Sequence, residues 1–252
     1  INHNDEFSSI SSIAKYVSNP ILAKLSLLEA KKVLDDEIAV MNSSNAVTFI
    51  NSDDSIIYQN VLDKSRIKYT TIPIYIDSIK THIPKNYEKN FDHTKNILLV
   101  GSFDWLPKKL NAEWLSNIVF PIVLKSFPES RLIIVGRGAD QLTISNKSVY
   151  VYSDVLDVDK YYSKANIFAI PEKQSGGLKI KSLEAASKGM AIISTKFGIS
   201  GSMLEDGHEC IVCEMEAEAF AKAIIGLIKN EKDLHIWLWR NVGRGILFAV
   251  QE

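Results

Sequence analysis

Short, mostly apolar segments alternate with segments of helical periodicity from about Asn96 onward. The apolar segments predict six strands, at 97–100, 131–135, 148–152, 167–170, 191–194 and 210–212, and the segments between them predict helices near 111–125, 158–164, 178–188 and 217–229. Such alternation is typical of a parallel sheet buried between two layers of helices. We therefore predict an α/β fold with a Rossmann-like parallel sheet and flanking helices, whose ligand binds at the carboxyl ends of the strands.

The first 95 residues have a different pattern. Pro20–Asp36 predicts a long helix that continues to about Ser43, and strands are expected at Ala46–Ile50 and Tyr69–Ile76, with a helix capped before Asp53. These elements are too few for a domain of this type, so we predict that residues 1–77 are the C-terminal part of an incomplete second α/β domain. Both chain ends are expected to be cut, because the chain begins with Ile1 and ends within an apolar stretch.

Composition and charge narrow the class of protein. The 252 residues are 46% hydrophobic and 23% charged, and the net charge is −1. The chain is too apolar for disorder, and it has no uncharged apolar run of about 18 residues that could span a membrane. Without a basic field no nucleic-acid partner is expected, so any anion site must be local. Two cysteines cannot form a disulfide framework, and we expect a reducing, cytoplasmic location.

The segment from Pro171 to Gly201 carries the most chemical information. Gly176-Gly177 precedes a helix predicted to begin near Leu178. Glycines at that position let backbone N–H groups approach an anion, which the helix dipole also favours.

Two lysines, Lys179 and Lys181, stand in the first turn of this predicted helix, where cations oppose the dipole unless an anion binds. Glu184 is expected on the same face, one turn deeper. The alternative is an ordinary loop with solvated lysines and a Lys181–Glu184 ion pair, and the spacing alone leaves both interpretations open.

The same segment resembles the donor-site signature of family 4 glycosyltransferases, which have the GT-B fold. The matching letters are GGLKIKSLEA, followed by KGMAIISTKFGISG. Gly101–Pro107 resembles the turn that opens the nucleotide domain in one branch of the family, and Phe127–Glu129 with Leu132–Gly136 resembles its second strand–helix junction. Ala46–Asp53 is similar to the strand and cap that close the N-terminal domain. The resemblance covers roughly 200 residues, with at least four motifs in order.

The resemblance implies a role for each matched residue. Lys181 contacts the donor diphosphate and Glu184 the ribose hydroxyls, and these two are the expected catalytic residues. Further donor contacts are expected from Gly176, Gly177, Leu178, Lys179, Arg137, Gly101 and Ser102. The alternative for Arg137 is an exposed loop arginine. Residues 96–230 are then the nucleotide-sugar domain, 78–95 a linker, and 231–252 a helix that returns to the N-terminal domain.

Two positions depart from the family pattern. Many members carry a glutamate that meets the donor sugar eight residues before the ribose-binding glutamate, but this position is Gly176 here, and Glu172 is the nearest acid. The residue after Pro107 is often Asn in this branch, but it is Lys108 here, which either contacts phosphate or is solvated. The donor sugar and its recognition are therefore left open.

The resemblance implies a glycosyltransferase of polysaccharide biosynthesis that moves a sugar from a nucleoside-diphosphate sugar, with a UDP-sugar as first choice, to a saccharide or lipid-linked acceptor. Retention of configuration and no cofactor or metal are expected. One alternative is a nucleotide-sugar binding module that needs a missing N-terminal half or a partner chain, and another is a nucleotide-sugar epimerase. Peripheral association with the inner face of a membrane also stays open. Cys210 and Cys213 match CxxC, but they fall on a predicted strand, where residues three apart face opposite sides.

Overall fold

The computed structural model describes residues 6–14, 16–50, 55–56, 58, 62, 67–72, 95–174 and 179–230. These residues form two compact units. The first contains the described residues up to Ile72 together with Gln174, Lys179 and Ser200–Ser202, and the second contains a larger sheet with its helices. The predicted helix start at Asp53, the linker at 78–95 and the predicted helix at 231–252 lie outside the described residues.

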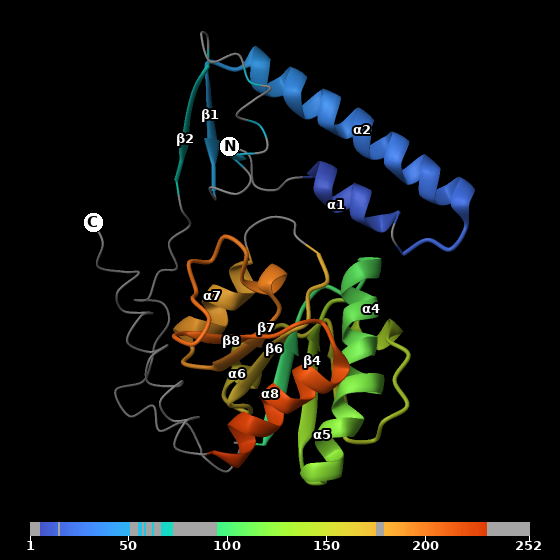
Figure 1. The fold of residues 1–252 in the computed structure, drawn as a ribbon, viewed down its shortest axis with the longest axis vertical. Helices are drawn as coiled ribbons and strands as arrows, with labels where there is room; N and C mark the ends of the chain where they lie inside the picture. The colour runs from blue at the N-terminus through green and yellow to red at the C-terminus, as the bar shows by residue number, and fades with distance from the viewer. Residues whose placement is uncertain are drawn as a thin grey trace. The chain divides into compact units, whose positions relative to one another are not determined.

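The first unit contains two helices, α1 (Glu6–Ile13) and α2 (Pro20–Ser43), which lie side by side (Figure 1). The side chain of Asn19 accepts hydrogen bonds from the first backbone N–H groups of α2, and Pro20 suits the first helical position because its missing N–H needs no partner there. Two short strands, β1 (Ala46–Phe49) and β2 (Lys68–Thr71), pair in parallel. The predicted long helix and first strand are thus confirmed, whereas α1 was not predicted.

Most large apolar side chains of α2 are exposed. Ile21, Leu22, Leu25 and Leu28 have exposed fractions of 68%, 52%, 53% and 50%. Of this helix, only Ala30 and Met41 are buried among the described residues. The periodicity predicted the helix correctly, but the described residues pack on its apolar side mainly at the C-terminal half, where Leu34, Ile38 and Met41 contact the cluster around Phe49.

The second unit is built on a six-stranded parallel sheet (Figure 1). The strands lie in the order β5-β4-β3-β6-β7-β8. Their bounds are β3 (Asn96–Val100), β4 (Arg131–Gly136), β5 (Val149–Ser153), β6 (Ile167–Ile170), β7 (Ala191–Ser194) and β8 (Cys210–Val212). All six predicted strands are confirmed to within a residue, because β3, β4, β6 and β7 are buried on both faces and read as continuous apolar runs.

Helices cover both faces of this sheet. One face packs against α4 (Leu106–Trp114), α5 (Phe120–Ser126) and α8 (Ala217–Lys229), and the other against α6 (Asp159–Tyr162) and α7 (Ile180–Ser187). Short 3₁₀ turns occur at Ala139–Gln141 and Lys196–Ile199. The predicted α/β fold with a Rossmann-like sheet is therefore confirmed. None of the helices in the described ranges is long and apolar enough to cross a membrane.

The helix predicted at 111–125 begins five residues earlier and is interrupted. Trp105 is extended and Pro107 occupies the first turn, so α4 begins at Leu106. A π-helical turn at Leu115–Val119 then joins α4 to α5, where Pro121 supplies no N–H for the regular hydrogen-bond pattern. The earlier start of α4 matters for the site, because it places Lys108 in the first helical turn.

Candidate functional site

Most of the predicted site residues follow strands of the large sheet at their carboxyl ends. Strands β3 and β6 are neighbours there, although β6 follows β5 along the chain, so the strand order reverses between them. Ligands of open parallel sheets bind outside the carboxyl ends at such a reversal. All six strands are parallel, so the described segments that follow each of them leave this edge, and those after β3 and β6 flank the reversal.

The ends of β3 and β4 meet through two glycines. Gly136 has a φ of +144°, and a Cβ atom at this residue would lie 1.7 Å from the carbonyl oxygen of Gly101. The backbone N–H of Phe103 donates to the carbonyl of Arg137 at 2.7 Å, which extends the contact into both loops. This close approach fixes the backbone of Gly101 and Ser102, two of the predicted donor contacts, both of which are half-buried.

Arg137 lies in the loop after β4. Its Nε atom is 2.5 Å from Oδ2 of Asp104, and its side chain is 71% exposed. Gly138, in the left-handed region with a φ of +70°, leaves room for this arrangement, since a Cβ there would lie 2.2 Å from Oδ1 of Asp104. Arg137 is thus an exposed loop arginine held by one ion pair, at the edge where we expect the ligand.

Lys181 and Glu184 form an ion pair on the first two turns of α7. The ammonium Nζ of Lys181 is 2.7 Å from Oε2 of Glu184, and the two side chains are 46% and 34% exposed. The prediction that the two share a helix face is confirmed. The helix begins at Ile180, two residues later than predicted, so Lys179 precedes it. This pair alone does not decide between a solvated charge pair and an anion site.

A third side chain, Tyr162 of α6, completes this cluster. Its hydroxyl donates to the same Oε2 atom of Glu184 at 3.2 Å, and its ring stacks on Phe168 with 5.7 Å between centroids. Burial raises the pKa of Tyr162, and the negative charge of Glu184 raises it further, so the phenol stays protonated and remains a donor. The sequence pattern gave no signal for this residue beyond a predicted helix at 158–164.

A second ion pair joins the segments that follow β3 and β6. Lys108 donates through Nζ to Oε1 of Glu172, which is only 5% exposed. The hydroxyl of Thr195, after β7, donates to the backbone carbonyl of Glu172. Lys108, one of the two positions that depart from the expected pattern, is therefore the partner of Glu172, the acid nearest to the other position, although 64 positions separate Lys108 and Glu172 in the chain.

Three predicted donor contacts, Gly176, Gly177 and Leu178, lie outside the described residues. Lys179 is described and half-buried, and its place before α7 is the only part of its predicted role on which the structure bears.

The two cysteines lie on and beside β8. The thiols of Cys210 and Cys213 donate to the carbonyls of Glu205 and Ser194, each at 3.6 Å. Burial raises the pKa of Cys210 to about 12 and that of Cys213 to about 11, so both thiols are protonated at neutral pH. Among residues in the described ranges, no three His, Cys, Asp or Glu side chains gather closely enough to hold a metal ion, and metal independence stays a prediction.

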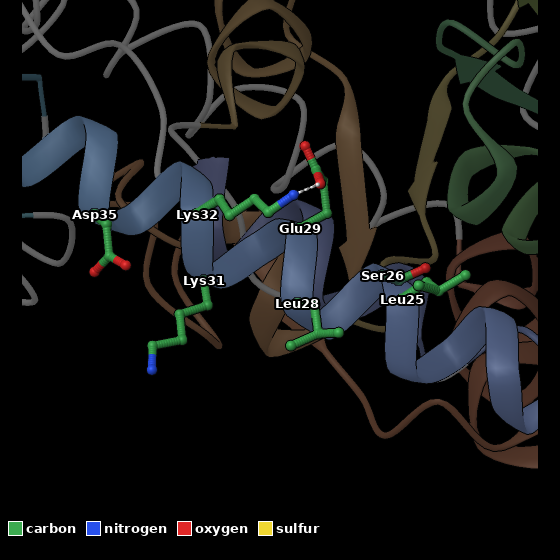
Figure 2. A pocket seen from close by; sticks show the side chains of 7 residues that line it. All are labelled: Leu25, Ser26, Leu28, Glu29, Lys31, Lys32 and Asp35. Carbon is green, nitrogen blue, oxygen red and sulfur yellow. Dashed lines mark hydrogen bonds and ion pairs between the residues drawn. The ribbon is translucent and has the colours of Figure 1, made fainter.

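Figure 2 shows a hollow on the surface of α2. It is lined by side chains of that helix alone, and none of the predicted site residues takes part. Lys32 and Glu29 pair across it at 3.4 Å, so opposite charges partly cancel there. The sheet edge, and not this hollow, gathers the chemistry that the sequence predicts.

Comparison with known proteins identifies a family for this chain. The family model described as glycosyl transferases group 1 matches residues 94–230. The chain is 28% identical over 169 residues to a Klebsiella pneumoniae protein named "Uncharacterized 44.6 kDa protein in cps region", covering 60% of this chain and 43% of that one. It is 26% identical over 217 residues to an uncharacterized glycosyltransferase of Haemophilus influenzae, covering 79% and 56%. The chain thus spans about half the length of these two relatives.

A solved structure shares the fold. The crystal structure of a mutant of S. aureus TarM, in complex with fondaparinux, alpha-GlcNAc-glycerol and UDP, matches with a TM-score of 0.65 at 12% identity. The match covers 89% of this chain and 43% of TarM. It supports the GT-B fold.

Proposed function

Since this chain belongs to the family of group 1 glycosyl transferases, we propose that it binds a nucleoside-diphosphate sugar at the carboxyl edge of the large sheet and transfers the sugar to a saccharide or other hydroxyl acceptor. Anomeric configuration is retained, and no metal is bound at the diphosphate. The observation that carries this proposal is the cluster of Lys181, Glu184 and Tyr162.

Lys181 suits a diphosphate because its present partner is easily replaced. An ion pair between two partly exposed side chains contributes about 0–1 kcal/mol, since water screens the charges. A diphosphate offers more negative charge and several acceptor oxygens, so the ammonium can move from Glu184 to the ligand at little cost. Arg137 would add positive charge to the same ligand. The backbones of Gly101 and Ser102 would supply N–H donors to it.

Glu184 suits the ribose because, among the described residues, only one of its carboxylate oxygens has partners. The phenol of Tyr162 and the ammonium of Lys181 both donate to Oε2. No hydrogen bond to Oε1 is present among the described residues. A carboxylate accepts hydrogen bonds from hydroxyl groups, so Oε1 can bind a ribose hydroxyl, and Oε2 becomes available to a second one when Lys181 turns to the phosphates.

The reaction breaks the bond between the anomeric carbon and the diphosphate oxygen, and the electron pair stays on the diphosphate. The acceptor hydroxyl oxygen bonds to the anomeric carbon and loses its proton, which gives a glycoside, the nucleoside diphosphate and one proton. Negative charge therefore grows on the diphosphate in the transition state. Lys181 would stabilise that charge more strongly than it stabilises the bound donor, which is how a binding group becomes catalytic.

Uridine is the first choice of base, and the UDP in the TarM complex supports it without deciding it. We place the enzyme in the cytoplasm, in polysaccharide biosynthesis, with a saccharide or lipid-linked acceptor.

The alternative function, a nucleotide-sugar binding module, differs from the transferase in whether this chain itself binds the acceptor. Because the chain spans about half the length of its relatives, the donor side alone would make it a nucleotide-sugar binding module that needs further residues or a partner chain for transfer.

The test is calorimetric titration with UDP, ADP and GDP and their glucose derivatives, followed by assay of diphosphate release with and without saccharide acceptors. Binding together with acceptor-dependent release supports the transferase, and binding without release supports the binding module. No binding of any of the six compounds would contradict both.

A further inference from the structure

The ion pair between Lys108 and Glu172 bridges the place where the strand order of the sheet reverses. Lys108 stands in the first turn of α4, which follows β3, and Glu172 is two residues beyond the end of β6. Strands β3 and β6 are paired neighbours in the middle of the sheet. Because ligands of such sheets bind outside the carboxyl ends at this reversal, the pair lies where part of a ligand is expected.

Glu172 is buried but incompletely partnered. Its side chain is 6% exposed, against 29% for Lys108. Only Oε1 accepts a hydrogen bond, and no other bond to the carboxylate exists among the described residues. Oε2 is not among the described side-chain atoms that are both sealed from solvent and without a hydrogen-bond partner, so a ligand can reach it. The bare Oε2 atom is therefore an acceptor that a ligand can complete.

The main chain around Glu172 is fixed from both sides. Its backbone N–H donates to Ile170 at 3.0 Å, and its carbonyl accepts from the hydroxyl of Thr195, which is itself 3% exposed. Lys108 holds the other end of the side chain through Oε1. A carboxylate held at both ends has little conformational freedom left to lose when a ligand binds, as a recognition group requires.

The charge of this group selects the part of the donor that it can contact. A carboxylate repels the oxygens of a diphosphate, but it accepts hydrogen bonds from hydroxyl groups. The ammonium of Lys108 compensates the negative charge of Glu172, so the ion pair as a whole favours a neutral ligand rich in hydroxyl groups, such as a sugar, over a phosphate.

We propose, on the basis of the function proposed above, that Glu172 binds a hydroxyl group of the donor's sugar through Oε2 and thereby helps to determine which sugar is accepted. Lys108 is the positioning residue that holds Oε1 and compensates the buried charge. Neither residue contacts the nucleoside or the diphosphate.

The test compares the affinity for a nucleotide sugar with the affinity for the same nucleoside diphosphate without a sugar. The full-length protein is titrated with whichever of UDP, ADP and GDP binds the wild type, and with its glucose, galactose and N-acetylglucosamine derivatives. Glu172→Gln keeps the size of the side chain but removes its charge. It should weaken binding of the preferred nucleotide sugar by about tenfold, the loss expected for one hydrogen bond to a charged group, and change binding of the sugar-free diphosphate by less than about twofold.

Equal effects on the two ligands would overturn this inference, whether both affinities fell or neither changed. A wild-type protein that bound none of the three diphosphates would overturn the proposed function as well, so the two failures are distinct. Glu218→Gln, an exposed acid on α8, is the charge-matched control and should change neither affinity.

Lys108→Met tests the positioning role. It should weaken binding of the nucleotide sugar and spare the diphosphate, whereas Lys108→Arg should restore most of the affinity for the sugar. Loss of diphosphate binding in Lys108→Met would make Lys108 a phosphate contact and contradict its assignment. Lys109→Met, which changes the next lysine of the same helix, is the matched control. If either single variant unfolds because it leaves a buried charge unpaired, the double variant Lys108→Met/Glu172→Gln removes both charges and should show the same selective loss.

Discussion

The hydroxyl of Tyr162 donates to Oε2 of Glu184 at 3.2 Å, although the two residues are 22 positions apart in the chain and lie on different helices. The same oxygen accepts from Lys181 at 2.7 Å. If Lys181 turns to a phosphate, as we propose, Tyr162 is the donor that would keep Glu184 in place. Tyr162 is thus a positioning residue for the proposed ribose contact.

Replacing Tyr162 by Phe should therefore reduce recognition of the ribose and leave the fold intact, because only one hydroxyl is lost from a stacked ring. Wild-type protein should bind UDP more tightly than 2′-deoxy-UDP, and Tyr162→Phe should reduce this discrimination by about three- to tenfold. Calorimetric titration with UDP and with 2′-deoxy-UDP measures the ratio of the two affinities in each protein. Tyr150→Phe, on an exposed ring of β5, is the control. Unchanged discrimination in Tyr162→Phe would contradict the positioning role.

Lys181→Ala should lower turnover more than it raises the donor KM, since the charge that Lys181 stabilises is greatest in the transition state. Loss of one group that stabilises a developing anion typically costs about 10²- to 10³-fold in kcat. Release of the nucleoside diphosphate by the full-length enzyme measures both constants. A variant with raised KM and unchanged kcat would show that Lys181 binds the donor without assisting its departure.

Gly136→Ala should destabilise the second unit strongly. A residue with a side chain at a φ of +144° is strained, and its Cβ would collide with the carbonyl of Gly101. We expect a loss of about 3 kcal/mol or more in the free energy of unfolding, measured by urea denaturation. Gly226→Ala is the matched control, because a Cβ there would meet nothing within 4 Å on α8, and it should stabilise the protein by about 0.5–1 kcal/mol. Equal effects of the two substitutions would show that the contact between the loops after β3 and β4 is not as described.

The thiols of Cys210 and Cys213 should react slowly in the folded protein. With pKa values of about 12 and about 11, raised by burial, the thiolate fraction at pH 8 is about 100-fold or more below that of a thiol with the ordinary pKa of 9.0. Reaction with a chromogenic disulfide reagent should therefore be slow, become about tenfold faster from pH 8 to pH 9, and be complete on unfolding. Fast reaction of either thiol at pH 8 would contradict the burial of β8.

The sequence predicted the sheet well because its strands are continuous apolar runs, a signal carried within each strand. It failed for α1, whose segment EFSSISSI contains four serines that favour caps and turns over helices. The start of α4 was also misplaced. Its N-cap residue is Trp105, whose side chain makes no capping hydrogen bond, so the residue type at this position does not indicate a helix start.

The chemistry on α7 was predictable because Lys181 and Glu184 are three residues apart, a spacing that one helix turn brings together. Tyr162 was not, since its contact with Glu184 depends on how α6 and α7 pack on the same sheet face. The Lys108–Glu172 pair was missed for the same reason. Each residue was noted separately, but only the reversal of strand order beside β3 and β6 brings them together.

The affinity of Lys181→Ala for UDP, measured by calorimetric titration beside the wild type and Lys222→Ala, is the decisive test of donor binding at α7. Lys222 is an exposed lysine of α8, so its replacement changes the net charge equally without touching the proposed site. If α7 presents its lysine to the donor diphosphate, Lys181→Ala weakens UDP binding by about 10- to 100-fold, and Lys222→Ala changes it by less than about twofold. Equal affinity of the two variants for UDP would contradict the account.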